Sequence, residues 1–168
     1  MNAIRVDSKA LTLSFKDKTI PCAIGRSGAC SADTKTEGDG YTPLGSWSIR
    51  GALFRPGRST PPNDITLPWR WIGKQDGWSD DPVDPSYNRP VRLPHPFSAE
   101  TLIRDDPLYD VIVVLGHNDA PPEPGNGSAI FFHVWNDSKP TAGCVAIARD
   151  EMDALLPRLT AGEPLEIR

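Results

Sequence analysis

The sequence predicts a mainly β fold in a single domain, a β sandwich or barrel-like sheet with a few short helices. Apolar residues gather in runs of strand length, which is the primary signal for strands. The 18 prolines and 14 glycines interrupt the chain too often for long helices. A length of 168 residues fits one domain with a single core, and we expect the domain to span residues 1–168.

Antiparallel strands are predicted in the first fifty residues. Leu11, Leu13 and Phe15 alternate with polar residues, as in a half-buried strand. A second apolar segment surrounds Cys22 to Ile24, and GSWSIR follows at residues 45–50. Glycine and aspartate turns separate these segments, so we expect neighbouring strands to pair.

Residues 51–100 have a different character. They are rich in proline, contain scattered tryptophans and show no sustained period of either 2 or 3.6 residues. Loops of this length are uncommon and are usually functional. We therefore predict a long ordered excursion, packed by its own aromatic residues, that serves as a lid or a binding wall.

The second half of the chain predicts strands and two short helices. Ser98 is placed to cap a helix through Leu102. The runs at 109–115, 129–134 and 143–148 are β-branched or aromatic and predict strands, and LEI at 165–167 predicts a last one. A helix is predicted between these last two strands because four apolar residues share one helical face, with Pro157 weakening its last turn: Met152, Leu155, Leu156 and Leu159.

Charge and hydropathy exclude several classes of partner. The net charge of -4 gives no basic field for nucleic acid. No apolar run approaches 18 residues, so no membrane span is predicted, and MNAIRVDSKALTLSF lacks the apolar core of a signal peptide. We expect either export by another route or a leader missing from this sequence.

Cysteine and histidine spacing gives no metal site. The histidines at 95, 117 and 133 lack close ligand spacing, and Cys144 has no neighbouring cysteine, so we predict neither metal nor organic cofactor. Cys22 and Cys30 are compatible both with a disulfide across a turn and with two free thiols.

The stretch FFHVWNDSKPTAGCVAI at 131–147 carries the candidate chemistry. Cys144 opens an apolar strand after Gly143, so two adjacent amides there predict an oxyanion hole beside a nucleophilic sulfur. His133 ends the preceding strand and is a candidate general base, and a hairpin loop between the strands would bring the two together. The alternative is a buried core cysteine and a hydrogen-bonded histidine.

Several further stretches carry a family resemblance: EGDGYTPLGSWSI at 37–49, DGWSDDP at 76–82, LYDVIVVLGHN at 108–118, GSAIFFHV at 127–134 and PTAGCVAI at 140–147. In this order they resemble the YkuD-like L,D-transpeptidase catalytic domain. The resemblance implies a cysteine acyltransferase that cross-links peptidoglycan stem peptides in the periplasm. It also implies that Cys144 is the nucleophile and His133 the general base.

The chain departs from the commoner family signature at two places. Ala142 stands where a histidine usually precedes the glycine, after Thr141, and Ala146 stands where an arginine or asparagine often follows the cysteine. The spacing from His133 to Cys144 is also shorter than usual. A substrate carboxylate then needs other partners, and the candidates are Arg89, Arg149 and the loop at 76–78.

The TAGC variant resembles a branch that joins L-alanine to diaminopimelate, a 1,3-type cross-link. The alternatives are a 3,3-type transpeptidase, an L,D-carboxypeptidase or amidase that transfers the acyl group to water, and a non-catalytic wall-binding module. A cytoplasmic hydrolase of recycled peptides is a further alternative. We expect stem peptides as donor and acceptor, and a monomeric protein.

The candidate substrate-binding residues lie around this motif and in the excursion: His117, Asn118, Thr141, Ala142, Trp78, Asp81, Tyr87 and Arg149. For His117 the alternative is a turn residue that caps a strand. For the residues of the excursion the alternative is an anchoring aromatic with solvated acids. His133 needs an acceptor for its second ring nitrogen, and we favour a backbone carbonyl over Asp119 or Asp137.

Overall fold

The computed structural model describes residues 4–168. Residues 1–3, which begin the N-terminal segment where no signal peptide is predicted, lie outside it. A ten-stranded sheet forms most of the molecule. Its strands are β1 (Ile4–Asp7), β2 (Thr12–Phe15), β3 (Lys18–Pro21), β4 (Gly28–Ser31), β5 (Tyr41–Phe54), β6 (Trp69–Trp71), β10 (Val111–Leu115), β11 (Phe131–Val134), β12 (Val145–Ile147) and β13 (Pro164–Ile167).

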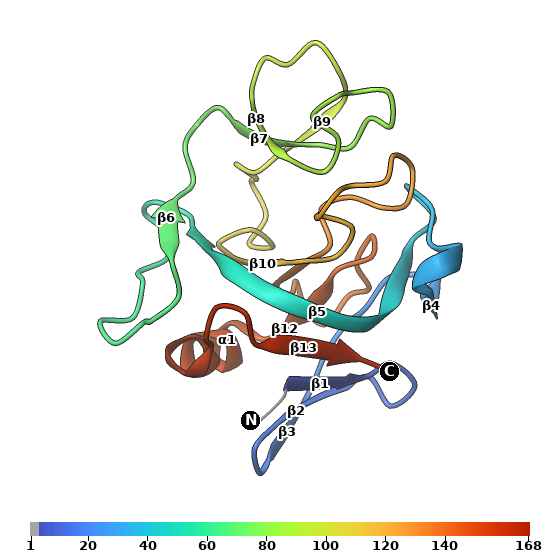
Figure 1. The fold of residues 1–168 in the computed structure, drawn as a ribbon. Helices are drawn as coiled ribbons and strands as arrows, with labels where there is room; N and C mark the ends of the chain where they lie inside the picture. The colour runs from blue at the N-terminus through green and yellow to red at the C-terminus, as the bar shows by residue number, and fades with distance from the viewer. Residues whose placement is uncertain (1–3) are drawn as a thin grey trace.

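The long strand β5 organises this sheet (Figure 1). The strand order is β12-β11-β10-β5-β13-β1-β2-β3, and β4 and β6 also pair with β5. A strand of 14 residues can pair with different partners along its length, so β5 joins the two halves of the sheet. The predicted mainly β fold is confirmed.

The first fifty residues form the predicted antiparallel pairs only in part. β1, β2 and β3 pair antiparallel, with Leu13 and Phe15 buried. Leu11 instead lies 47% exposed in a turn, with a φ of 53°. The segment around Cys22 makes isolated bridges from Ala23 to Ala146 and from Gly25 to Thr141, and β4 pairs with β5 in parallel.

The excursion at 51–100 has more regular structure than predicted. A separate three-stranded sheet, seen at the top of Figure 1, consists of β7 (Asp76–Ser79), β8 (Pro90–Arg92) and β9 (Ala99–Thr101). The predicted helix from Ser98 to Leu102 is wrong, because residues 99–101 pair with β7 instead. So short a segment gains little from helical propensity, and ladder hydrogen bonds decide its conformation.

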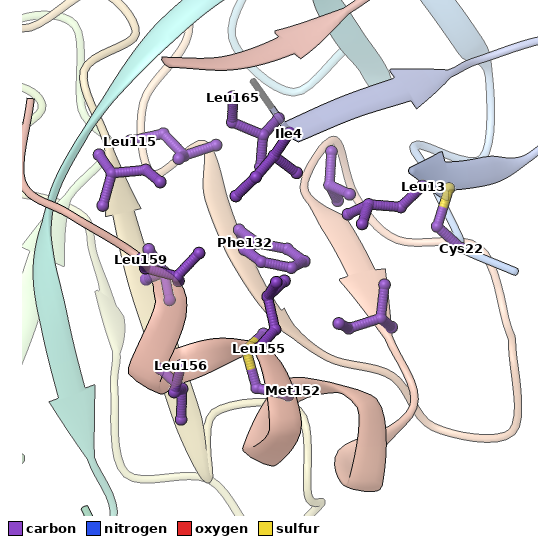
Figure 2. Packing of buried hydrophobic residues seen from close by; sticks show 14 of the residues in the cluster. Ile4, Leu13, Cys22, Leu115, Phe132, Met152, Leu155, Leu156, Leu159 and Leu165 are labelled. Atoms are coloured by element: carbon purple, nitrogen blue, oxygen red, sulfur yellow. The ribbon is translucent and has the colours of Figure 1, made fainter. Parts of the chain in front are cut away.

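The helix α1 (Arg149–Leu155) continues into a 3-10 turn, η2 (Leu156–Arg158), and a second 3-10 turn, η1 (Ala32–Thr34), precedes β5. Pro157 lies inside η2, so the predicted weak last turn takes the tighter geometry. Figure 2 shows Met152, Leu155 and Leu156 packing beneath Phe132, the apolar face that their spacing predicts. No helix among residues 4–168 is long and apolar enough to cross a membrane.

Alternation along the strands divides the buried residues into two clusters. Phe132 and Val145 point into the main core, which α1 covers. Their neighbours Phe131 and Cys144 point to the opposite face, into a second cluster that contains Trp78 from the excursion. The three-stranded sheet therefore covers the face of the main sheet on which Cys144 lies.

Candidate active site

Cys144 immediately precedes β12, and two hydrogen bonds fix its sulfur. The thiol donates to the carbonyl of Ala129 over 3.2 Å, and the amide of Phe131 donates to Sγ over 3.3 Å. The side chain is 6% exposed. Burial raises the pKa of the Cys144 thiol to about 12, although the Phe131 amide acts in the opposite direction.

The small exposed part of Cys144 faces a cleft of about 370 Å³. The cleft is lined by the turn before β12, by the segments around Ser128 and Lys35, and by the excursion: Arg26, Lys35, Glu37, Gly38, Asp80, Glu100, Tyr109, Ser128, Ala129, Ile130, Ala142, Gly143 and Cys144. Asp80 and Glu100 come from the three-stranded sheet and its edge. The excursion thus forms one wall of the cleft.

His133 lies on the same sheet face as Cys144, but a hairpin does not bring them together. β11 and β12 pair in parallel, and His133 is opposite Ala146. Because the strands run in the same direction, Cys144 enters its strand near Phe131 rather than beside the end of β11. The prediction of a hairpin loop was wrong, because a hairpin joins antiparallel strands and these two are parallel. Thr141 and Ala146 instead bridge to residues 23–25.

The ring of His133 is fixed in one tautomer. Nδ1 lies 2.7 Å from the carbonyl oxygen of Val134, the kind of acceptor that the sequence favours. A carbonyl only accepts, so Nδ1 carries the proton and Nε2 keeps a lone pair. The ring of Tyr109 packs edge-on against the imidazole, with centroids 5.4 Å apart.

Burial lowers the pKa of His133 to about 4, so its imidazole is neutral near pH 7. The Cys144 thiol, whose pKa is raised by burial, is also neutral there. The resting site therefore holds a thiol and an uncharged base rather than a thiolate and an imidazolium.

Thr42 and Thr141 fix the turn that presents Cys144. The hydroxyl of Thr42 donates to the carbonyl of Gly143 over 2.7 Å, and that of Thr141 donates to the carbonyl of Cys144 over 2.6 Å. The Gly143 amide donates to the Thr141 hydroxyl over 3.1 Å, so in this conformation it is occupied rather than free for an oxyanion. A Cβ on Gly143, whose φ is +149°, would lie 3.0 Å from the Tyr41 carbonyl oxygen.

Asn88 joins the excursion to the site. Its Oδ1 accepts from Trp78 Nε1 at 2.9 Å and from the amide of Ala129 at 3.1 Å. Its Nδ2 donates to the carbonyls of His117 and Asn118. Trp78, a predicted substrate-binding residue, is buried edge-on against Phe131 and anchors this junction.

His117 does not line the cleft. Its ring packs edge-on against Trp47, with centroids 4.7 Å apart, and is 4% exposed. Burial lowers the pKa of His117 to about 4. Asn118 uses its side-chain amide to hold the carbonyls of Glu123 and Gly127, which shapes the loop before Ser128.

The other predicted substrate-binding residues also lie outside the cleft lining. Tyr87 is buried, and its hydroxyl donates to Glu37 over 2.5 Å. Asp81 accepts hydrogen bonds from backbone amides of the excursion, and Arg89 donates to the carbonyl of Asp119. Arg149 pairs with Asp153 on α1. Of the predicted substrate-binding residues, Ala142 lines the cleft and Thr141 supports it.

Several cleft residues escaped prediction: Arg26, Lys35, Glu37, Glu100, Tyr109 and Ser128. Glu37 begins the stretch EGDGYTPLGSWSI, and the family resemblance of this stretch was the signal in the sequence that could have pointed to Glu37. Lys35 is a buried lysine, 4% exposed, whose ammonium donates to Asp39 over 2.6 Å. A buried lysine is rare unless paired, but burial is not visible in the sequence.

The fold and the site define a class of protein. It is a mainly β domain with a cysteine thiol at a cleft and a neutral histidine on the same face of the sheet. Residues 2–167 match the family model described as YkuD, the L,D-transpeptidase catalytic domain. The chain belongs to this family of L,D-transpeptidase catalytic domains.

Several solved structures are similar to this chain at low sequence identity. Bd1075 of Bdellovibrio bacteriovorus gives a TM-score of 0.53 at 18% identity, over 99% of this chain and 47% of that one. L,D-transpeptidase 1 of Mycobacterium tuberculosis gives 0.44 at 13% identity, over 99% of this chain and 60% of that one. An L,D-transpeptidase from Mycobacterium smegmatis gives 0.46 at 13% identity, over 99% of this chain and 58% of that one.

This chain therefore spans between 47% and 60% of the length of these solved chains. No curated protein matches it.

Proposed function

We propose that this domain is a cysteine acyltransferase that acts on peptidoglycan stem peptides through a thioester on Cys144. The observation that carries the proposal is the position of the Cys144 sulfur, which lines the cleft and is held by Phe131 and Ala129. Family membership supports the class of substrate. The stem peptide binds in the cleft with its scissile carbonyl carbon at Sγ.

In the first step Sγ bonds to the carbonyl carbon and the C–N bond of the donor peptide breaks. The proton of the thiol passes to Nε2 of His133, the free nitrogen of the neutral ring, and then to the leaving amine. In the second step the acceptor amine attacks the thioester. The C–S bond breaks, the amine gives its proton to His133, and the proton returns to the sulfur.

The neutral Cys144 thiol and the neutral His133 imidazole of the resting site suit this sequence of steps. A thiol that donates to Ala129 stays protonated until substrate displaces that contact, and the Phe131 amide then stabilises the developing thiolate. The Gly143 amide becomes available to an oxyanion when it leaves the Thr141 hydroxyl.

We propose the 1,3-type cross-link between L-alanine and diaminopimelate over the 3,3-type, because the TAGC variant resembles a branch that forms it. We also propose a periplasmic location, which a peptidoglycan substrate supports, and fractionation of cells with an antibody to the native chain tests it. We keep the prediction of a monomer, which sedimentation tests.

Muropeptide analysis tests the proposed reaction. Peptidoglycan is incubated with the wild type, Cys144→Ala or Cys30→Ala, and the digests are compared by liquid chromatography and mass spectrometry. Cys30 is the matched control because it is a half-buried thiol that does not line the cleft. We expect new dimers with the wild type and Cys30→Ala only, and fragmentation identifies the bond.

Trimmed monomers that depend on Cys144 would assign an L,D-carboxypeptidase or amidase instead. Unchanged digests with the wild type would remove the catalytic proposal. Intact-mass measurement of the protein with a stem tetrapeptide checks the intermediate, since the thioester adds the acyl mass to Cys144.

A further inference from the structure

His133, the proposed general base, is almost closed off from solvent. Its side chain is 2% exposed and does not line the cleft, whereas the neighbouring Tyr109 does. The ring of Tyr109 packs edge-on against the imidazole, with centroids 5.4 Å apart and planes at 77°. Tyr109 therefore connects the cleft to His133.

The ring of Tyr109 is fixed by further contacts. A second edge-on contact joins it to Phe131, with centroids 5.8 Å apart. The guanidinium of Arg104 lies 5.2 Å from the ring centroid, which is the distance of a cation–π interaction. Tyr109 is itself only 6% exposed. The ring has little room to turn away from the imidazole.

The hydroxyl of Tyr109 is tied to the excursion. It donates to Oε1 of Glu100 over 2.5 Å, and Glu100 lies in β9, opposite Trp78 of β7. Arg104 Nη1 lies 3.9 Å from the same carboxylate oxygen. Burial raises the pKa of the Tyr109 phenol well above its ordinary value, so the hydroxyl keeps its proton and is the donor. One hydrogen bond thus joins the three-stranded sheet to the side chain that contacts the proposed base.

A general base needs a fixed ring as well as a free nitrogen, because catalytic side chains act well only when packing holds their geometry. The Val134 carbonyl fixes the tautomer of His133 through Nδ1. That single hydrogen bond leaves the imidazole free to pivot about it. Among the aromatic contacts within residues 4–168, the one that limits this motion is with Tyr109.

We propose that Tyr109 and Glu100 are positioning residues for His133. The inference rests on the proposed function, which makes His133 the base. Glu100 holds the Tyr109 hydroxyl, and the ring held in this way closes the imidazole off from water and keeps the direction of Nε2. Tyr109 acts through the imidazole, and Glu100 acts through Tyr109.

Burial is the largest cause of the low pKa of His133. The Val134 carbonyl and Asp106 raise this pKa and Arg104 lowers it. Arg104 and Asp106 are joined by hydrogen bonds of 2.9 and 2.6 Å, so their charges partly offset each other.

The Cys144 thiol and the Tyr109 phenol, which lie on the same face, are uncharged near pH 7 because burial raises the pKa of each. Water admitted by loss of the Tyr109 ring should therefore raise the pKa of His133 from about 4 towards about 6.5.

Nuclear magnetic resonance of protein labelled with ¹⁵N in its histidines tests the positioning. Long-range correlation between ring protons and ring nitrogens distinguishes the two tautomers, and titration from about pH 8 to about pH 5 follows protonation. The His133 signals are assigned by their loss in His133→Gln. We expect the wild type to show a single tautomer with the proton on Nδ1, neutral across this range.

Three variants separate the ring from its tether. Tyr109→Leu removes the ring, and the pKa of His133 should rise by at least about one unit, with both tautomers populated. Tyr109→Phe keeps the ring but releases it from Glu100, and its His133 pKa should lie between those of the wild type and the leucine variant. Glu100→Gln keeps an acceptor oxygen and should restore the signals of the wild type.

Tyr87→Phe is the matched control. It removes another buried phenol that donates to a glutamate over 2.5 Å, in this case Glu37, and the Tyr87 hydroxyl makes no contact with His133. The His133 signals should not change. His117, whose ring packs against Trp47, serves as an internal control in every spectrum.

His133 signals like those of the wild type in Tyr109→Phe would overturn the proposal, because Glu100 would then not hold the ring in place. Thermal unfolding shows whether each variant is folded, and if Tyr109→Leu is not, Tyr109→Phe decides alone. Equal changes in His117 and His133 would indicate a general loosening of the fold and would also count against the proposal.

The rate of thioester formation at saturating stem tetrapeptide, followed by intact mass, connects positioning to chemistry. A general base contributes roughly 10²–10⁴-fold, so Tyr109→Phe should form the thioester at least about tenfold more slowly, and Glu100→Gln should remain close to the wild type. A slower reaction with unchanged His133 signals would assign Tyr109 to the substrate instead and reject the positioning. Changed signals with an unchanged rate would keep the positioning and reject His133 as the base. A wild type that forms no thioester would reject the proposed function, and the resonance data would still judge this inference.

Discussion

The Cys144 thiol donates its proton to the carbonyl of Ala129 over 3.2 Å, and Ala129 itself has a left-handed backbone with a φ of 51°. Residues other than glycine seldom adopt this conformation, and it persists only where the surroundings impose it. Here the Ala129 amide donates to Asn88, which reaches across from the excursion. The position of Ala129, the acceptor for the Cys144 thiol, therefore depends on Asn88, which lies 56 positions before Cys144 in the chain.

Replacing Asn88 tests this dependence. Asn88→Ala removes the acceptor of Trp78 and Ala129 together with the donor to the carbonyls at 117 and 118. We expect the free energy of unfolding in urea to fall by about 2–4 kcal/mol, since buried partners lose their hydrogen bonds. Asn88→Asp keeps the acceptor but sets a buried carboxylate oxygen against the carbonyl oxygens of His117 and Asn118, so near pH 7 it should lose at least as much. A change in Asn88→Ala below about 0.5 kcal/mol, the level of an ordinary surface substitution, would contradict this role.

Thr42 is a second test of the scaffold, at the turn that carries Cys144. Thr42→Val preserves the shape but removes the hydroxyl that donates to Gly143 and accepts from the Gly25 amide. The unpaired buried groups should lower the free energy of unfolding by about 1–3 kcal/mol. Thr42→Ser retains the hydroxyl and is the control. Equal stability of the valine variant and the wild type would show that the turn does not need this link.

The two buried histidines predict how stability depends on pH. Burial is the main cause that lowers the pKa values of His117 and His133 to about 4, whereas histidines in the unfolded chain titrate near 6.5. Between these values the unfolded chain binds more protons than the folded one, so acidification from pH 6.5 towards 4 destabilises the fold. Each histidine contributes up to about 1.4 kcal/mol per pH unit.

Urea unfolding at pH 7, 6 and 5 measures this dependence. We expect a loss of stability at each step below pH 6.5 and a smaller loss for His117→Gln, in which one of the two groups is absent. A free energy of unfolding that is constant between pH 7 and pH 5 would show that the histidines are not buried in their neutral form.

Thiol alkylation tests the resting state of the site. Burial is the largest cause that raises the pKa of Cys144 to about 12, and the thiolate is the reactive form. Iodoacetamide at pH 7.5 should therefore modify Cys144 more slowly than half-buried Cys30, as followed by peptide mass spectrometry. In denaturant the thiols should react at similar rates. Faster alkylation of Cys144 than of Cys30 in the folded protein would indicate a thiolate that is already formed.

Local pattern determined the strands and the helix face of this chain. Alternation and β-branched runs predict β10, β11 and β12, and the spacing of Met152, Leu155 and Leu159 predicts the buried face of α1. The ordered motifs along the chain also resemble the family whose model matches residues 2–167. Each of these signals lies within a short segment, where side-chain periodicity follows directly from backbone geometry.

The tertiary structure decided which segments meet. β11 and β12 pair in parallel, and residues 23–25 bridge to Ala146 and Thr141. The strand at 99–101 replaces a predicted helix because β7 supplies its hydrogen bonds. Glu37, Asp80 and Glu100 line one cleft although they lie on three segments far apart in the sequence. The sequence named Cys144 and His133 because motif chemistry is local. Their burial and their neutral state arise from long-range packing, which no single segment encodes.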